Sequence, residues 1–504
     1  MTSIDRPSSP HAPGPPRTPA HPLHARLVVP IAVAGVAMLL AVAPRYGYHR
    51  DELYFRLLGE RPALGYFDTP PFTPAVARLS TALFGDNLVA LRVFPALCFG
   101  VLIVLAALVA REAGGGRGAQ ALAAAGTATS VLPLVMGHML LTLTPDTVLW
   151  VAALLFVMRA LLRGDGRWWL AVGAVMGAAT YNRQLIVLVV LGVGAGILLA
   201  GPRSVLRDRR LWLGALLAVV IAAPNLFYQA THDWPQAQMS QALALDEGAG
   251  NRADFLPMQI LLLGPPLAVI CAAGWWRLWR DAALRCLAIA YPVACALVLY
   301  AGGRPDYTGG LLILLYAVGC VPAAAWLTTV PRRVVLIGAV AVNGVLSIIV
   351  ALPVIPVSAL AETPVPEVNE ASRESVGWPE LAAAVGGVVA GLSPADRSGA
   401  IILTQNYGEA GALALHSARY ALPPIYSGHN ELSFWGPPPD SATVAVVLTD
   451  APRRFATLFA ECAEKARVDN GVGVRNEEQN LPILVCRSPV SPWHTLWPRL
   501  RHYS

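Results

Sequence analysis

Long apolar stretches recur along this chain of 504 residues, and they limit what it can fold into. Each measures roughly 18 to 23 residues, the length that a helix needs to cross a bilayer, and they continue to about Pro353. In lipid the backbone polar groups must be satisfied within the helix itself. The composition agrees, because 55% of the residues are hydrophobic and only 13% are charged. The sequence therefore predicts an α-helical polytopic membrane protein and excludes an ordinary soluble enzyme.

We expect about eleven transmembrane helices. The predicted spans are Leu27–Pro44, Leu88–Ala110, Ala119–Met136, Leu143–Leu162, Trp168–Tyr181, Gln184–Gly201, Leu211–Tyr228, Met258–Trp279, Leu284–Gly302, Thr308–Thr328 and Val334–Leu352. Arginines cluster between alternate spans, so the positive-inside rule places the N-terminus in the cytoplasm. Residues 1–25 are predicted to be a disordered cytoplasmic tail, and we expect no signal-peptide cleavage after them. Residues 26–352 form the predicted membrane domain.

The formal charge of +6 does not indicate a nucleic-acid partner. The basic residues lie in short clusters between apolar stretches, not on one continuous face, so their role is topological.

After Leu352 the composition becomes that of a soluble protein. Residues 353–504 predict a Pro-rich linker, a helix over Pro379–Leu392, and strands over Ala400–Thr404, Thr443–Thr449 and Leu481–Cys486. A small α/β domain fits this pattern. With eleven spans before it, the domain lies outside the cytoplasm. Cys462 and Cys486 both lie in it, and an oxidising compartment would let them form a disulfide.

The first outer loop, residues 45–87, carries more charge than a simple connection needs. Asp51 and Glu52 open an amphipathic stretch, which predicts a helix lying along the membrane surface. The acid pair would lie in its first turn, where the helix dipole favours carboxylates. The alternative is that both acids only cap a solvated helix.

Two further acids lie on the predicted outer side. Asp68 belongs to Gly65–Phe72, where paired prolines fix a bend that holds the carboxylate beside the first helix. Such a carboxylate is suited to be a general base or a metal ligand, and the alternative is a turn cap. Asp146 begins the fourth span; it is either an N-cap that follows Pro145 or a functional acid at the mouth of the bundle.

Arg183 and Arg304 also lie on the outer side, where topology does not favour arginine, and Tyr307 follows Arg304 in the same segment. Each arginine could pair with an anionic headgroup or with one of the acids. His232 lies in the outer loop 229–256 and could add an imidazole to a metal site. No spacing motif supports this, and a lone histidine is more often not a ligand.

At these residues the chain resembles the membrane glycosyltransferases of the C-type (GT-C) fold, specifically the protein O-mannosyltransferase-like family that includes the bacterial lipid A aminoarabinose transferases. The resemblance lies in Tyr48–Glu52, Gly65–Phe72 and Thr144–Thr147, in the span order over roughly residues 27–330, and in residues 406–411 and 427–430, which look like the C-terminal domain of actinobacterial members. In one departure, Thr69 stands where the aminoarabinose transferases have lysine. This puts a phosphate contact at that position in doubt.

The resemblance implies a glycosyltransferase in a bacterial plasma membrane. It would move a sugar from a polyprenyl-phosphate donor to an acceptor hydroxyl of a protein, lipid or glycan on the outer face, with inversion at the anomeric carbon. Asp51 matches the catalytic acid position of the family, Glu52 is its neighbour, and Asp146 matches the second acid of the cleft. We assign removal of the acceptor proton to Asp51.

The resemblance also concerns the donor phosphate and a metal. Asp68 falls where some members carry a metal-binding carboxylate, so His232 is a candidate co-ligand and a divalent metal ion a candidate cofactor. Neutralisation of the donor phosphate is assigned to Arg183, to Arg304 with Tyr307, or to such an ion.

Two other classes of function are compatible with parts of this sequence. A polytopic transporter or lipid flippase would have this number of spans, but the sequence lacks charges at span centres and any internal repeat. A non-catalytic assembly protein would use its outer domain to bind wall polymer.

Overall fold

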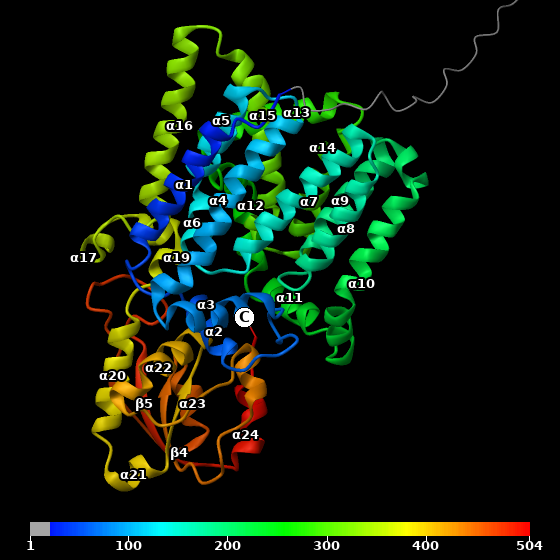
Figure 1. Cartoon of the computed structure of the whole chain (residues 1–504). Helices are drawn as coiled ribbons and strands as arrows, with labels where there is room; N and C mark the ends of the chain where they lie inside the picture. The colour runs from blue at the N-terminus through cyan, green and yellow to red at the C-terminus, as the bar shows by residue number, and fades with distance from the viewer. Residues whose placement is uncertain (1–20, 504) are drawn as a thin grey trace, which may run out of the picture.

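The computed structural model describes residues 21–503, and it consists of a helical bundle joined to a smaller α/β domain (Figure 1). The predicted N-terminal tail lies outside the described residues up to position 20. The bundle contains α1 (Ala25–Val42), α4 (Leu88–Glu112), α5 (Arg117–Ala128), α6 (Val131–His138), α7 (Leu143–Arg163), α8 (Arg167–Ala179), α9 (Ile186–Ala200), η1 (Arg203–Arg207), α10 (Arg209–Thr231), α12 (Gly248–Leu261), α13 (Pro265–Arg280), α14 (Arg285–Ala301), η2 (Pro305–Thr308), α15 (Gly309–Trp326) and α16 (Val330–Ala351).

The protein is a multi-pass membrane protein, but the predicted count of eleven spans is not confirmed. Among residues 21–503, six helices are long and apolar enough to cross a membrane, or up to eight if each bent helix pair is one span. Helices α8, α9 and α14 have 13, 15 and 17 residues, which is short of the ~20 that a bilayer core requires.

Two predicted spans are broken in the structure. Ala119–Met136 bends by 58° between α5 and α6, and Met258–Trp279 is broken by local backbone chemistry. The sequence pattern over Met258–Trp279 is continuous, yet α12 and α13 meet at 88°. Gly264 between them has a φ of +101°, a conformation that favours glycine. Pro265 and Pro266 follow, and proline starts a helix but cannot continue a preceding one. The hydropathy of the sequence does not reveal such a break, because the residues on both sides of it are apolar.

Glycines let several bundle helices approach closely. A Cβ on Gly173 of α8 would lie 1.9 Å from the carbonyl oxygen of Gly214 on α10, and one on Gly274 of α13 would lie 1.8 Å from the carbonyl of Leu315 on α15. Small residues at helix contacts are typical of membrane bundles, where close van der Waals packing replaces the hydrophobic effect.

Two short helices within residues 45–87, α2 (Arg50–Gly59) and α3 (Phe72–Phe84), lie across the base of the bundle, between it and the α/β domain (Figure 1). Helix α2 was expected to lie along the membrane surface. Its apolar residues Leu53, Tyr54 and Leu58 are instead buried, because α22 of the α/β domain packs on it so closely that a Cβ on Gly411 would lie 2.8 Å from Leu53. Helix α11 (Pro235–Asp246) lies on the same side of the bundle.

The α/β domain is built on a five-stranded sheet in the order β2-β1-β3-β5-β4. Strands β1 (Ala400–Thr404), β2 (Ile425–Ser427) and β3 (Val444–Leu448) are parallel, whereas β5 (Pro482–Pro489) is antiparallel to both β3 and β4 (Phe459–Arg467). The linker and loops add α17 (Val357–Leu360), α18 (Val365–Val368), α19 (Glu370–Arg373), α21 (Pro394–Ser398), η3 (Asn430–Trp435) and α23 (Pro452–Ala456).

Helices cover both faces of this sheet. Alternate strand residues point to opposite faces, so α20 (Trp378–Ala390) and α22 (Tyr407–Tyr420) cover one face, and α24 (Trp493–Leu500) covers the other. Cys462 of β4 and Cys486 of β5 form a disulfide. The carboxyl ends of β1 and β2 lead into Tyr407 and Asn430, and both residues lie at the junction with the bundle.

Candidate functional site

A cavity of about 1220 Å³ runs from the junction of the two domains into the bundle. Inside the bundle its wall is apolar and comes from α8, α9 and α10, with Met176, Val190, Val193, Ile197 and Ala215 among the lining residues. Along α9 it extends from Ile186 to Leu198, which is about 18 Å at the α-helical rise. At the junction the lining becomes polar.

Asp51 lies at the polar end of this cavity, in the first turn of α2. The side chain of His49 caps the helix by accepting a hydrogen bond from the Asp51 amide at 3.2 Å. One carboxylate oxygen, Oδ1, accepts a hydrogen bond from the Tyr407 hydroxyl at 2.8 Å. The other oxygen makes no hydrogen bond within the part of the chain that the structure describes, so it is available to a group in the cavity.

Asp68 lines the same chamber and lies beside α2, where the paired prolines were expected to hold it. The Tyr54 hydroxyl donates to Oδ1 at 2.9 Å, and the Asn430 side-chain amide donates to Oδ2 at 3.2 Å. Desolvation raises the pKa of Asp68 to about 7. Asp68 is therefore held from both domains, and its protonation changes near neutral pH.

Replacing Asp68 with asparagine is expected to alter stability in a pH-dependent way. The pKa of Asp68 is about 7 in the folded protein and about 3.9 in an unfolded chain. The folded state therefore binds more protons between these values, and the wild-type free energy of unfolding falls as the pH rises through them. Asparagine avoids this loss, so Asp68→Asn should unfold at a higher temperature than wild type at pH 8 but not at pH 4. Thermal unfolding of the purified protein at the two pH values checks this.

Asp86→Asn is the control, because the pKa of Asp86 is shifted in the opposite direction to that of Asp68. The hydrogen bonds from Arg56 lower the pKa of Asp86, so its contribution to stability is present at neutral pH and is lost as the pH falls. This variant should unfold at a lower temperature than wild type at pH 8. A gain at pH 8 in both variants would contradict the desolvation argument.

Glu52, the neighbour of Asp51, points away from the cavity and has no exposed surface. It forms a buried ion pair with Arg92 of α4, with hydrogen bonds of 2.7 and 3.0 Å. It also accepts hydrogen bonds from the amides of His49 and Leu140 at 2.9 and 3.1 Å. Its carboxylate therefore ties α2 to the bundle.

Asp146 lies in the first turn of α7 and does not line the cavity, so it and Asp51 do not share a wall. It is 3% exposed, and its Oδ1 has no hydrogen-bond partner within residues 21–503. Arg183 is close enough to interact with it electrostatically.

The predicted phosphate-binding residues do line the cavity. The Arg183 guanidinium lies over the Tyr307 ring at 4.7 Å, and among the described residues it has no ion pair or side-chain hydrogen bond. Arg304 is already paired with Glu370 at 3.2 Å and Glu247 at 3.7 Å. Arg183 is thus the cation that an anionic ligand would meet.

The proposed metal ligands are not part of a larger ligand set. Within residues 21–503, no group of three or more His, Cys, Asp or Glu side chains is arranged to hold a metal ion. His232 stacks on Tyr228 at 4.1 Å and is exposed, whereas Asp68 is held by Tyr54 and Asn430. These residues do not fit a metal site.

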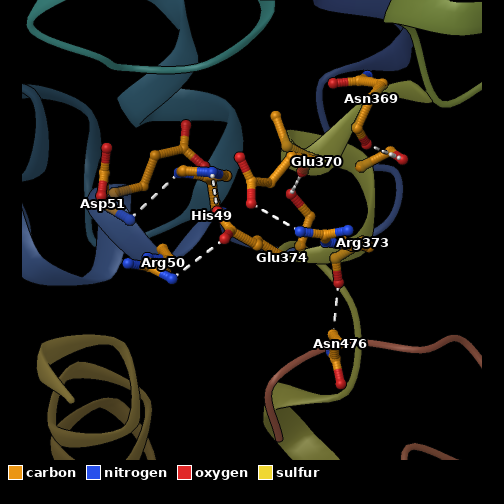
Figure 2. Close-up of polar contacts among 12 residues, drawn as sticks. His49, Arg50, Asp51, Asn369, Glu370, Arg373, Glu374 and Asn476 are labelled. Atoms are coloured by element: carbon orange, nitrogen blue, oxygen red, sulfur yellow. Dashed lines mark hydrogen bonds and ion pairs between the residues drawn. The ribbon is translucent and has the colours of Figure 1, made fainter. Parts of the chain in front are cut away.

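Sequence reasoning missed the residues that hold the two carboxylates. Tyr407 and Asn430 lie in motifs noted only for their resemblance to other C-terminal domains, and Tyr54 lies in the amphipathic stretch that Asp51 and Glu52 open. A second group of contacts was also missed. Figure 2 shows that His49 and Arg50 both contact Glu374, which lies in the linker to the α/β domain. No local signal pairs residues more than 300 positions apart.

Comparison with known proteins shows the fold. The family model of the dolichyl-phosphate-mannose-protein mannosyltransferases matches residues 68–228. ArnT from Cupriavidus metallidurans, solved with undecaprenyl phosphate bound, is 17% identical with a TM-score of 0.55, over 92% of this chain and 98% of that one. The apo form of ArnT gives 18% identity and a TM-score of 0.54, over 90% and 97%. The chain has the GT-C fold. The resemblance drawn from its sequence motifs is thereby confirmed.

A third structure with the GT-C fold also matches most of this chain. A variant of the arabinofuranosyltransferase AftD from Mycobacteria is 16% identical with a TM-score of 0.50, over 92% of this chain but only 42% of that one. No curated protein matches the sequence. The segment that the family model matches contains Asp68, Asp146 and Arg183 but not Asp51.

Proposed function

We propose that this GT-C protein transfers a sugar from a polyprenyl-phosphate donor to an acceptor hydroxyl on the outer face of a bacterial plasma membrane, with inversion at the anomeric carbon. The observation that carries the proposal is the continuous cavity, which joins an apolar groove inside the bundle to a chamber containing Asp51, Asp68 and Arg183. A lipid-linked sugar has matching chemistry, because its hydrocarbon chain needs an apolar path and its phosphate and sugar need a polar end.

Transfer would be a single displacement. The acceptor oxygen attacks the anomeric carbon as its proton passes to the open oxygen of Asp51, the general base. The bond from the anomeric carbon to the phosphate oxygen breaks, and its electron pair leaves with the polyprenyl phosphate. Attack from the face opposite the leaving group inverts the anomeric carbon. Arg183 is placed to stabilise the extra negative charge on the phosphate.

The other residues predicted for the site have supporting roles in this proposal. Tyr307 orients the Arg183 guanidinium from below, and Arg304 contributes positive charge while paired with acids. Glu52 holds α2 in place through Arg92. Asp146 acts through its electrostatic interaction with Arg183.

A panel of radiolabelled undecaprenyl-phosphate sugars, incubated with the purified protein in lipid nanodiscs and an extract of envelope glycans, lipids and proteins, tests the proposal. A transferase releases undecaprenyl phosphate and labels one acceptor class. A flippase moves the intact donor across the bilayer without releasing it, and that outcome would refute the proposal in favour of the transport hypothesis.

Replacing Arg183 with glutamine should weaken binding of undecaprenyl phosphate about 10- to 100-fold, because hydrogen bonds to charged groups contribute about 1.5–3 kcal/mol. Titration of the protein in nanodiscs with undecaprenyl phosphate measures the effect. Arg61→Gln is the matched control, since Arg61 lies over the Trp435 ring and does not line the cavity. Equal binding by the two variants would count against a phosphate site at Arg183.

A further inference from the structure

Both cavity carboxylates are held by side chains of the α/β domain. Tyr407, the first residue of α22, donates its hydroxyl to Asp51, and Asn430, which follows β2, donates its amide to Asp68. Tyr407 and Asn430 also line the cavity. The polar chamber is therefore built from both domains, although the motifs that carry the family resemblance of Asp51 and Asp68 lie in the membrane domain.

We propose that Tyr407 is a positioning residue for Asp51, so that the reactive orientation of this carboxylate depends on the docked α/β domain. The inference rests on the proposed function, because it concerns the group assigned as general base.

The Tyr407 ring is itself held on both faces. It stacks on Tyr54 at 4.4 Å and on His429 at 4.9 Å, and only 8% of the residue is exposed. Its backbone amide donates to Nδ1 of His429 at 3.2 Å. Because the Tyr407 ring is held in this way, its hydroxyl has a fixed position. The hydroxyl can therefore set the orientation of the Asp51 carboxylate.

The direction of the hydrogen bond to Asp51 follows from its neighbours. The Arg50 Nε donates to the Tyr407 hydroxyl oxygen at 3.1 Å, and a guanidinium can only donate. The hydroxyl proton is therefore directed to Asp51 Oδ1. One carboxylate oxygen is occupied by Tyr407, and the other has no hydrogen bond among residues 21–503, on a residue that lines the cavity.

A closed circuit of contacts continues from Arg50 back to Asp51 (Figure 2). Arg50 donates to Glu374 at 3.0 Å, and His49 Nε2 lies 3.0 Å from the same carboxylate. His49 Nδ1 accepts from the Asp51 amide, so Nε2 carries the proton and donates to Glu374.

Glu374 closes this circuit as a carboxylate. Burial opposes its ionisation, but the hydrogen bond from His49 and the charge of Arg50 outweigh burial and lower the pKa of Glu374 to about 2. Glu374 follows α19 in the linker, so both the linker and α22 act on the first turn of α2. Asp51 is thus fixed through its amide by His49 and through its side chain by Tyr407.

Tyr407→Phe tests the proposal, because it removes only the hydroxyl and keeps the ring stack. Without the hydrogen bond the Asp51 carboxylate can rotate away from the acceptor, and small misplacements of a catalytic group reduce rates up to ~100-fold. We expect the kcat for transfer from the undecaprenyl-phosphate sugar that wild type consumes to fall about 10- to 100-fold. The donor KM should stay within about twofold, since Tyr407 does not contact the phosphate-binding Arg183.

Tyr46→Phe is the matched control. The Tyr46 hydroxyl donates to the Ile355 carbonyl at 2.9 Å across the same junction, and Tyr46 does not line the cavity. Its kcat should be close to that of wild type. A wild-type kcat in Tyr407→Phe, or equal losses in both variants, would overturn the positioning role.

Hydrogen–deuterium exchange tests whether Tyr407 orders the first turn of α2 without relying on sugar transfer. In the full-length protein, Tyr407→Phe should increase exchange several-fold in peptides from the first turn of α2, relative to Tyr46→Phe, with unchanged exchange in α4. Unaltered exchange in that turn would overturn the inference whatever the transfer assay shows. If wild type consumes no donor but exchange rises as expected, the proposed function fails while the hold of Tyr407 on Asp51 stands.

Discussion

Asp51→Asn is expected to reduce sugar transfer about 10²- to 10⁴-fold, the range that a general base contributes. The amide keeps the size of the side chain, and its oxygen can still accept the hydrogen bond from Tyr407, so the fold should be unaffected. It cannot take the acceptor proton, because the amide NH2 group then replaces the second carboxylate oxygen and is not basic. Turnover of the undecaprenyl-phosphate sugar consumed by wild type, measured together with the unfolding temperature, checks this.

Glu60→Gln provides the control for charge on α2. Glu60 lies at the other end of the helix, is exposed, and does not line the cavity. Its transfer rate should equal that of wild type. If Asp51→Asn transferred sugar at the wild-type rate, Asp51 would not be the base, and Asp68 would be the next carboxylate of the chamber to replace.

Arg92→Met is expected to destabilise the protein by about 3–5 kcal/mol, because it leaves the buried Glu52 carboxylate without its partner. Arg92 is 1% exposed and also donates to the carbonyl oxygens of Ala43 and Gly47. The yield of folded protein and its denaturation midpoint in detergent measure the loss.

The double variant Arg92→Met with Glu52→Gln distinguishes a structural from a catalytic role of Glu52. Removing the unpaired charge should recover part of the lost stability, which a double-mutant cycle reports as coupling between the two sites. Arg56→Met is the control, because its partner Asp86 is partly exposed and such pairs contribute at most about 1 kcal/mol. Normal stability with lost transfer in Glu52→Gln would instead assign Glu52 to the chemistry.

The positions of Asp51 and Glu52 were predicted only in part from the sequence. The placement of Asp51 and Glu52 in the first turn of a helix followed from the amphipathic pattern, and the structure has α2 there. Which acid meets the cavity did not follow, because both are polar and neighbouring helix positions point about 100° apart. Only the position of Arg92 on α4 shows that Glu52 faces the protein interior.

The placement of Asp68 followed from the sequence for a similar reason. It lies 14 positions after Tyr54, and the paired prolines Pro70 and Pro71 that follow it restrict the backbone at its carboxyl side. The contacts of Tyr407 with Asp51 and of Asn430 with Asp68 span 356 and 362 positions. Hydropathy and turn chemistry are local and carry no information about such pairs.

The sequence by itself determined that this chain is a multi-pass membrane protein with an acid-rich first loop, because apolar length, helix starts and proline bends act over a few neighbouring residues. The tertiary structure alone decided which carboxylates share a cavity, which one is neutralised in the core, and that the α/β domain reaches the chamber. Those outcomes depend on helix packing and domain docking, which bring together side chains that are distant along the chain.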